Sequence, residues 1–221
     1  MNVKKHFLII YLLSLSVLHY GQQPDYGFTL KGGVNFPVGD FSKYYNAGLG
    51  GFGGLFYNIN PTTRVSASIG YNSWTVDLDA LNEELTNSGN TGKYDVEAPI
   101  KTVPILINVK FFWRNNEKLH PYALLEGGIY KITREVYGRY IYDTGESIKI
   151  TAQSENVTNG SFNVGVGFEY LINEVITVDV SSRYHLVLNQ DVYNFGDAGY
   201  GTSYSTNNFI SVFAGINVFF Q

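Results

Sequence analysis

The chain of 221 residues carries 15 Lys and Arg against 19 Asp and Glu, and its formal net charge is −4. An acidic chain without a Lys/Arg run is a poor binder of nucleic acid. It contains no cysteine, which excludes disulfides, thiolate chemistry, cysteine zinc sites and N-terminal cysteine lipidation. Charged residues make up 15% of the chain and aromatic residues 16%, whereas typical soluble domains have about 25% charged residues. This composition is typical of a membrane β-barrel with aromatic girdles.

The N-terminal segment has the layout of a secretory signal peptide. Lys4 and Lys5 precede the apolar run Phe7–Leu18, and small Gly21 comes before a polar stretch. The run is shorter than the roughly 20 residues that a membrane-spanning helix needs, and a retained helical anchor is the alternative. We therefore expect a signal peptide over residues 1–21 and one barrel domain over residues 22–221.

Beyond residue 25 the sequence shows no helical period. Runs of about ten residues alternate between apolar and polar side chains and end at turn residues, which predicts strands. In the clearest run, Val178 and Val180 share one face while Asp179 and Arg183 share the other. The eight predicted strands are Tyr26–Phe36, Gly48–Asn58, Arg64–Asn72, Pro99–Trp113, Tyr122–Arg134, Ser161–Ile172, Val175–Leu188 and Phe209–Phe220.

The predicted connections alternate between tight turns and longer loops. The tight turns are 59–61, 114–121 and 173–174, and the longer loops are 37–47, 77–98, 135–160 and 189–208. This alternation is typical of outer-membrane barrels. It argues against a lipocalin or β-sandwich fold, in which loop lengths are not sorted by end. The predicted fold class is all-β, an eight-stranded antiparallel up-and-down transmembrane β-barrel in the outer membrane. Its charged face must point inward, because an Arg or Lys facing mid-membrane lipid costs about 2–4 kcal/mol.

Several short motifs resemble the small outer-membrane barrels of the OmpA/OmpX type. The sequence is most similar to the Bacteroidetes outer membrane protein β-barrel family that includes PorT-like proteins. The residues that carry the resemblance are Lys31–Pro37, Gly39–Phe41, Val103–Leu106, Pro121–Tyr122, Gly127–Tyr130 and the aromatic C-terminal strand. The resemblance implies a fold, a cellular address and insertion by the barrel-insertion machinery, but no activity. Gln221 follows Phe220 where these barrels usually end on the aromatic residue.

The inward faces collect ionisable side chains of both signs. An eight-stranded barrel is just wide enough for side chains to fill, so these groups are expected to pair and plug the lumen. A narrow small-solute channel is an alternative. No catalytic, cofactor-binding or metal-binding residue is predicted. The expected structural ion-pair network consists of Lys31, Arg64, Lys110, Glu126, Glu169, Asp179, Arg183 and His185.

A second alternative function is a lipid-modifying barrel enzyme, and it depends on His185. Arg183-Tyr184-His185 faintly resembles lipid A deacylases, in which a nucleophilic Ser lies two residues past the His. Here that position is Val187, and a His without a nearby hydroxyl cannot perform this acyl chemistry. The acidic cluster around Asp77 and Glu83 lacks the spacing of a calcium loop, and Gly50–Gly54 lacks the Lys-Ser/Thr of a phosphate loop.

The long loops are the expected place for a protein partner. Exposed Tyr is preferred in recognition surfaces and equally in lipid-boundary girdles, so both readings stay open. The other expected partners are outer-membrane lipids. The candidate recognition residues are Tyr137, Tyr140, Tyr142, Tyr193, Tyr200 and Tyr204.

Overall fold

The computed structural model describes residues 26–113, 118–188, 191–193, 202–204 and 207–220. The predicted signal peptide, residues 1–21, lies outside these ranges. Eight long strands are present: β1 (Tyr26–Pro37), β2 (Gly48–Asn60), β3 (Thr63–Trp74), β5 (Ile100–Phe112), β6 (Leu119–Ile141), β7 (Ser147–Leu171), β8 (Ile176–Val187) and β11 (Phe209–Phe219). The shorter elements are η2 (Gly39–Lys43), α2 (Leu78–Asn87), β4 (Lys93–Glu97), β9 (Asp191–Tyr193) and β10 (Thr202–Tyr204).

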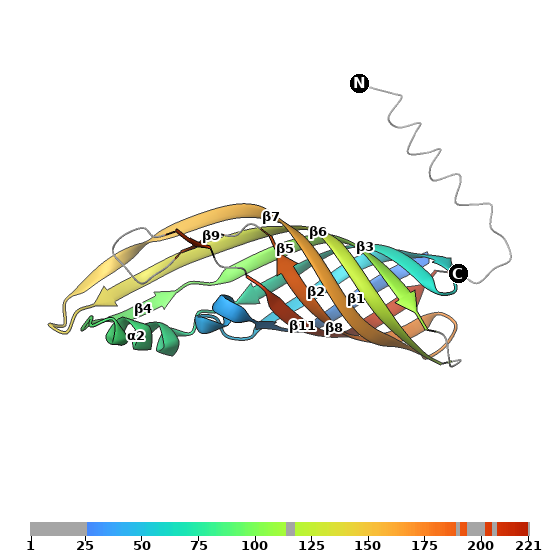
Figure 1. The fold of residues 1–221 in the computed structure, drawn as a ribbon, viewed down its shortest axis with the longest axis horizontal. Coiled ribbons are helices and arrows are strands. Elements are labelled where there is room, and N and C mark those ends of the chain that lie inside the picture. The colour runs from blue at the N-terminus through green and yellow to red at the C-terminus, as the bar shows by residue number, and fades with distance from the viewer. Residues whose placement is uncertain (1–25, 114–117, 189–190, 194–201, 205–206, 221) are drawn as a thin grey trace, which may run out of the picture.

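The eight long strands form one closed antiparallel barrel (Figure 1). Each pairs with its neighbours in chain order, and β1 pairs with β11 from Gly27↔Phe219 to Pro37↔Phe209. Because the barrel is closed, its strands have no free edge. A free edge would expose backbone N–H and C=O groups that hydrocarbon cannot hydrogen-bond. The predicted fold class and all eight strands are confirmed.

The alternation of side chains places the apolar face outward. Leu55 is 64% exposed and Ile107 is 68% exposed, whereas Lys31 and Lys110 are buried on the inner face. Exposed aromatic side chains flank the strand ends near the tight turns; they include Tyr26, Tyr57, Trp113 and Phe220. The wall thus has the apolar band and aromatic girdle of an outer-membrane barrel.

The predicted loop 77–98 contains a helix and a strand. Asp77 caps α2 by accepting hydrogen bonds from the backbone N–H groups of Asp79 and Ala80, at 3.1 Å each. The expectation of no helix beyond residue 25 is therefore wrong. α2 buries Leu81 and Leu85, and with Leu78 these residues follow the i, i+3, i+7 spacing of one helix face, so a short helical signal was present in the sequence. Among the described residues, no helix combines the length and apolarity needed to cross a membrane.

The predicted loop 135–160 is largely a β-hairpin. β6 and β7 stay paired beyond the barrel as far as Ile141↔Ser147, and β4 pairs with the outer part of β6 (Figure 1). We call this three-stranded part, β4 with residues 135–141 of β6 and 147–154 of β7, the extension. Apart from buried Val96, the side chains described for β4, for residues 135–141 and for residues 147–150 and 154 are exposed or half-buried. Without a lipid-facing or buried face, the segment lacks the alternation that marks a barrel strand.

Glycines on the closing strands permit a close approach of the backbone. A Cβ at Gly33 in β1 would collide with Val212 O and with Phe213 Cα and Cδ1 of β11, the latter two at 2.9 Å. A Cβ at Gly53 in β2 would meet nothing within 4 Å. The two positions therefore offer a matched test of closure.

We predict that Gly33→Val disrupts β1–β11 pairing, whereas Gly53→Val preserves it. Protein extracted from outer membranes in detergent would be run on SDS gels with and without heating. Wild type and Gly53→Val should migrate faster unheated than boiled, as closed barrels do, and Gly33→Val should lose most of this shift. Equal shifts in both variants would show that the β1–β11 seam tolerates a side chain at position 33.

Candidate functional site

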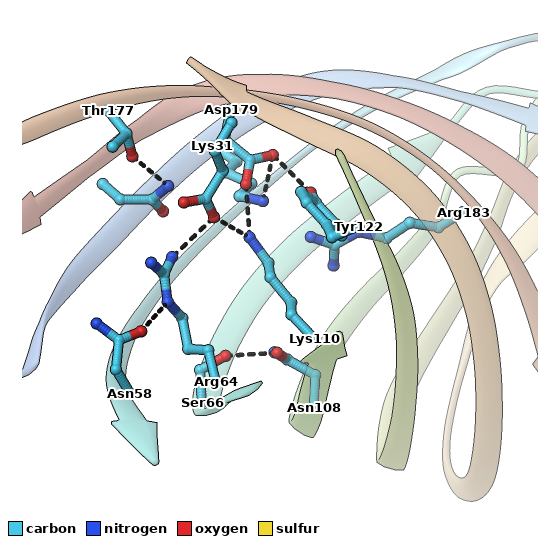
Figure 2. A network of polar contacts seen from close by, with 12 residues as sticks. Lys31, Asn58, Arg64, Ser66, Asn108, Lys110, Tyr122, Thr177, Asp179 and Arg183 are labelled. Carbon is cyan, nitrogen blue, oxygen red and sulfur yellow. Dashed lines mark hydrogen bonds and ion pairs between the residues drawn. The ribbon is translucent and has the colours of Figure 1, made fainter. Parts of the chain in front are cut away.

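Asp179 on β8 is the centre of a buried polar network in the lumen. Its Oδ1 lies 2.6 Å from Lys31 Nζ, and its Oδ2 lies 2.6 Å from Lys110 Nζ. Tyr122 donates a 2.8 Å hydrogen bond to Oδ1. Figure 2 shows these side chains converging on Asp179 from three other strands. All four residues are buried, so hydrogen bonds within the protein take over the role of water.

Glu169 on β7 binds one further cation, Arg64, and shares Lys110 with Asp179. Its Oε1 lies 2.7 Å from Arg64 Nη1 and 2.7 Å from Lys110 Nζ, so Lys110 joins both carboxylates. Arg64 Nε also donates to Asn58 Oδ1 at 2.8 Å, and the guanidinium lies 4.3 Å from the Phe56 ring centroid. The arrangement holds each cation by more than one contact.

The strand register explains this geometry. Glu169 lies directly opposite Asp179 on β7 and β8, and Arg64 lies directly opposite Lys110 on β3 and β5. Like charges in such cross-strand pairs repel. The two pairs face one another across the lumen, so each like-charged pair is neutralised by the other.

Arg183 and Glu126 form a separate pair. Arg183 Nη1 lies 2.7 Å from Glu126 Oε1, and both side chains are buried. The guanidinium carbon is 5.2 Å from the Phe52 ring centroid and 5.5 Å from that of Phe213. Seven of the eight predicted lumen residues therefore take part in buried ion pairs.

His185 does not join the ion pairs, and its inclusion in that network is wrong. Its ring nitrogens lie 2.8 Å from Tyr130 Oη and 3.0 Å from Ser211 Oγ. Its ring stacks on Phe209 with centroids 4.2 Å apart. The groups beside it on neighbouring strands are neutral, so among the described residues it has no carboxylate partner.

A chain of neutral hydrogen bonds runs from His185 around the barrel. Ser211 donates to Asn35 Oδ1 at 2.6 Å, Asn35 to Asn72 Oδ1 at 2.9 Å, and Asn72 to Thr102 Oγ1 at 3.2 Å. With Tyr130, the chain links β6, β8, β11, β1, β3 and β5. Sequence reasoning missed these residues, although each occupies an inward position of its strand.

The premise that His185 lacks a nearby hydroxyl is wrong, because Ser211 of β11 supplies one. Its proximity comes from the β8–β11 pairing and not from local spacing. Both residues are fully buried at 0% exposure, and Ser211 already donates its proton to Asn35. A nucleophile needs a base and access for the substrate; this pair is enclosed within a packed lumen.

An aromatic layer covers the lumen on the loop side of His185. Phe41 from η2 packs 5.4 Å from Trp74, and Trp74 packs 4.9 Å from Phe209, both edge to face. All three side chains are buried. The lumen is thus filled by three layers, one of ion pairs, one of neutral hydrogen bonds and one of aromatic rings.

The remaining motifs hold no cofactor or metal geometry. Asp77 serves as a helix cap, and within the described ranges no group of three or more His, Asp or Glu side chains is placed to hold a metal. Gly50–Gly54 lies in β2, where a Cβ at Gly50 would collide with the Asn35–Asn72 pair. The small residues there make room for the hydrogen-bond chain.

The candidate tyrosines of the extension lie on two faces. Tyr140 packs edge to face against Tyr94, with centroids 5.3 Å apart, and against Tyr142 at 4.9 Å. On the other face, Tyr137 donates to Glu97 Oε2 at 2.6 Å. Tyr193 and Tyr204 belong to β9 and β10, which pair with each other, and Tyr200 lies outside the described residues.

Two of these tyrosines have shifted acidities. The hydrogen bond to the Glu97 carboxylate raises the pKa of Tyr137, and burial together with Tyr140 raises the pKa of Tyr94. Both phenols are therefore neutral at physiological pH, and Tyr137 gives its proton to the Glu97 carboxylate in a hydrogen bond.

The sequence matches the family described as "Outer membrane protein beta-barrel domain" over residues 7–217. No curated protein shows a significant match. Among solved structures, the chain is similar to a major outer membrane protein from Thermus thermophilus, with 13% identity and a TM-score of 0.50 over 88% of this chain and 99% of that chain. Ail, the attachment invasion locus protein of Yersinia pestis, has 14% identity and a TM-score of 0.48 over 90% and 100%.

Neisserial surface protein A has 10% identity and a TM-score of 0.45 over 88% of this chain and 97% of that chain. Sequence identities this low indicate a shared fold but do not indicate a shared function. The family match covers nearly the whole chain and agrees with the closed eight-stranded ring. The chain belongs to the outer membrane protein β-barrel family and is an integral protein of the outer membrane.

Proposed function

We propose that the protein is a non-enzymatic outer-membrane barrel that closes its lumen with paired charges and presents the extension to a partner at the cell surface. The observation that carries this proposal is the contrast between the two ends. The tight-turn end has short connections, whereas β4, α2 and the β6–β7 hairpin project from the loop end (Figure 1).

The packing of the lumen supports a plug over a channel. Side chains from opposite walls touch through Lys110, Asp179 and Glu169. The cavity between them measures about 20 Å³, room for one or two waters. A conducting path would need several of these ion pairs to separate together.

The position of the extension supports recognition over a girdle role for its tyrosines. β5 ends its pairing with β6 at Arg134, and Tyr140 follows six residues later. At ~3.4 Å per residue this is about 20 Å farther along the strand, well past the apolar band. Tyr142 at the hairpin turn is 40% exposed, as a contact residue should be.

α2 protects the outer edge of the extension. The Asn82 side chain accepts a 2.6 Å hydrogen bond from Tyr94 N and donates to Tyr94 O at 3.1 Å, which satisfies backbone groups on the free side of β4. An exposed strand edge invites pairing with other chains. The extension is thereby directed toward side-chain recognition and away from edge-to-edge association.

The same proposal includes membership of the PorT-like group within the family. A PorT-like role in protein export rests on the sequence resemblance, and the aromatic C-terminal strand suits recognition by the barrel-insertion machinery. The lipid-modifying alternative has no comparable support, because the buried His185–Ser211 pair offers lipid no access.

We predict that Asp179→Asn lowers the free energy of unfolding by about 3–5 kcal/mol, because Lys31 and Lys110 lose their shared buried partner. The control Asp95→Asn removes the exposed ion pair with Arg139 and should cost about 0–1 kcal/mol. Urea unfolding in lipid vesicles measures both. Equal losses in the two variants would mean that the lumen charges are solvated, and the plug proposal would fail.

We predict that purified, folded protein conducts no steady current in planar lipid bilayers. A current is expected only when the plug is disrupted. The variant Lys110→Ala removes the side chain that joins Glu169 and Asp179, so this variant should conduct. Well-resolved openings of wild type, in preparations shown to be folded by gel shift, would favour the small-solute channel.

We predict that a photo-cross-linking residue at Tyr142 captures a discrete protein partner in living cells. The adduct should weaken when Tyr140→Ala removes the neighbouring ring, and a probe at lipid-facing Ile107 should give no such adduct. The adducts are resolved on gels and identified by mass spectrometry. Identical patterns at positions 142 and 107 would contradict recognition by the extension.

A further inference from the structure

A small cavity in the lumen is lined by every buried cation of the described barrel and by none of its buried carboxylates. Lys31, Arg64, Lys110 and Arg183 all border it, whereas Glu126, Glu169 and Asp179 lie on the far sides of their ion pairs. The cations therefore present their unpaired flanks to one shared space.

The charges of the described lumen do not balance. Four buried cations stand against three buried carboxylates, and His185 lies among neutral groups. One formal positive charge is therefore left among the buried side chains of the lumen. An uncompensated buried charge is strongly unfavourable, so the lumen favours a monovalent anion.

Unsatisfied donors point to the same place. Three buried donors of the cavity lining, Thr29 Oγ1, Ser68 Oγ and Arg183 Nε, have no hydrogen-bond partner within the described part of the chain, against one such acceptor, Asn217 Oδ1. An arginine N–H can only donate, and a hydroxyl can donate. Buried donors are nearly always satisfied in folded proteins, so an acceptor is required here.

The size of the cavity selects the ligand. At about 20 Å³ it suits one small, roughly spherical group. Water would satisfy the donors but would leave the excess charge unless Lys31 released its proton. We infer that the lumen contains a binding site for a single halide-sized monovalent anion, chloride under physiological conditions, held by Arg64, Lys31 and the Ser68 and Thr29 hydroxyls.

This inference goes beyond the recognition proposed for the extension and does not depend on it. The site would complete the charge balance of the plug from inside, so its ligand is a structural part of the barrel. Its test involves stability and scattering, which the extension does not affect.

The experiment compares urea unfolding of wild type, purified in detergent, in sodium chloride and in sodium methanesulfonate at equal ionic strength. Methanesulfonate screens charge equally but is too large for the cavity. A ligand that binds the folded state alone raises the unfolding midpoint with its concentration. The midpoint should therefore rise with chloride, and crystals grown in bromide should show an anomalous peak in the cavity.

Matched serine variants separate this site from general salt effects. Ser68→Ala removes a donor from the cavity and should at least halve the chloride-dependent shift. Ser181→Ala removes another buried, unpartnered lumen hydroxyl outside the cavity lining and should keep the full shift. Equal midpoints of wild type in the two salts, or a bromide crystal with no peak in the cavity, would show that water alone occupies it.

Discussion

Hydrocarbon can neither solvate a charge nor form hydrogen bonds with backbone N–H and C=O groups. This constraint determines the architecture of the barrel. It forces the β1–β11 seam to close and turns Lys31, Arg64, Lys110 and Arg183 inward. Eight strands leave too little space inside for bulk water. The inward charges must then be satisfied by one another, so the lipid outside determines the chemistry of the lumen.

Strand register converts that requirement into a particular network. Glu169 and Asp179 would repel as cross-strand neighbours, as would Arg64 and Lys110. Facing one another across the lumen, the two pairs attract. A one-residue slip would turn all of these groups toward lipid, so the network opposes slippage. The ion pairs thus contribute specificity of register as well as free energy.

The sequence predicts what lipid imposes and little else. All eight strands and the inward direction of Lys110 or Asp179 follow from alternation, because one face of each strand meets hydrocarbon. The pairing of Lys110 with Glu169 and Asp179 depends on register between strands 59 and 69 residues apart, which alternation does not encode. Alternation places His185 on the inner face of β8 but cannot distinguish the charged layer from the neutral layer in which it forms its hydrogen bonds. The outer β6–β7 hairpin was missed because neither of its faces meets hydrocarbon, and α2 was missed because its helical spacing, Leu78, Leu81 and Leu85, spans only two turns.

The same contrast explains how the barrel can support a recognition surface. β6 runs without a break from Glu126 in the lumen to Tyr140 in the extension, and β7 accompanies it. The ladder between β6 and β7 shifts register once, between Val136 and Gly138, and resumes beyond it, so the pairing that continues from the barrel sets the direction of Tyr140. Side chains of β6 beyond Arg134 contribute nothing to the apolar band or to the buried ion pairs of the lumen. Residues of the extension can therefore vary with the partner while the barrel retains the constraints set by lipid.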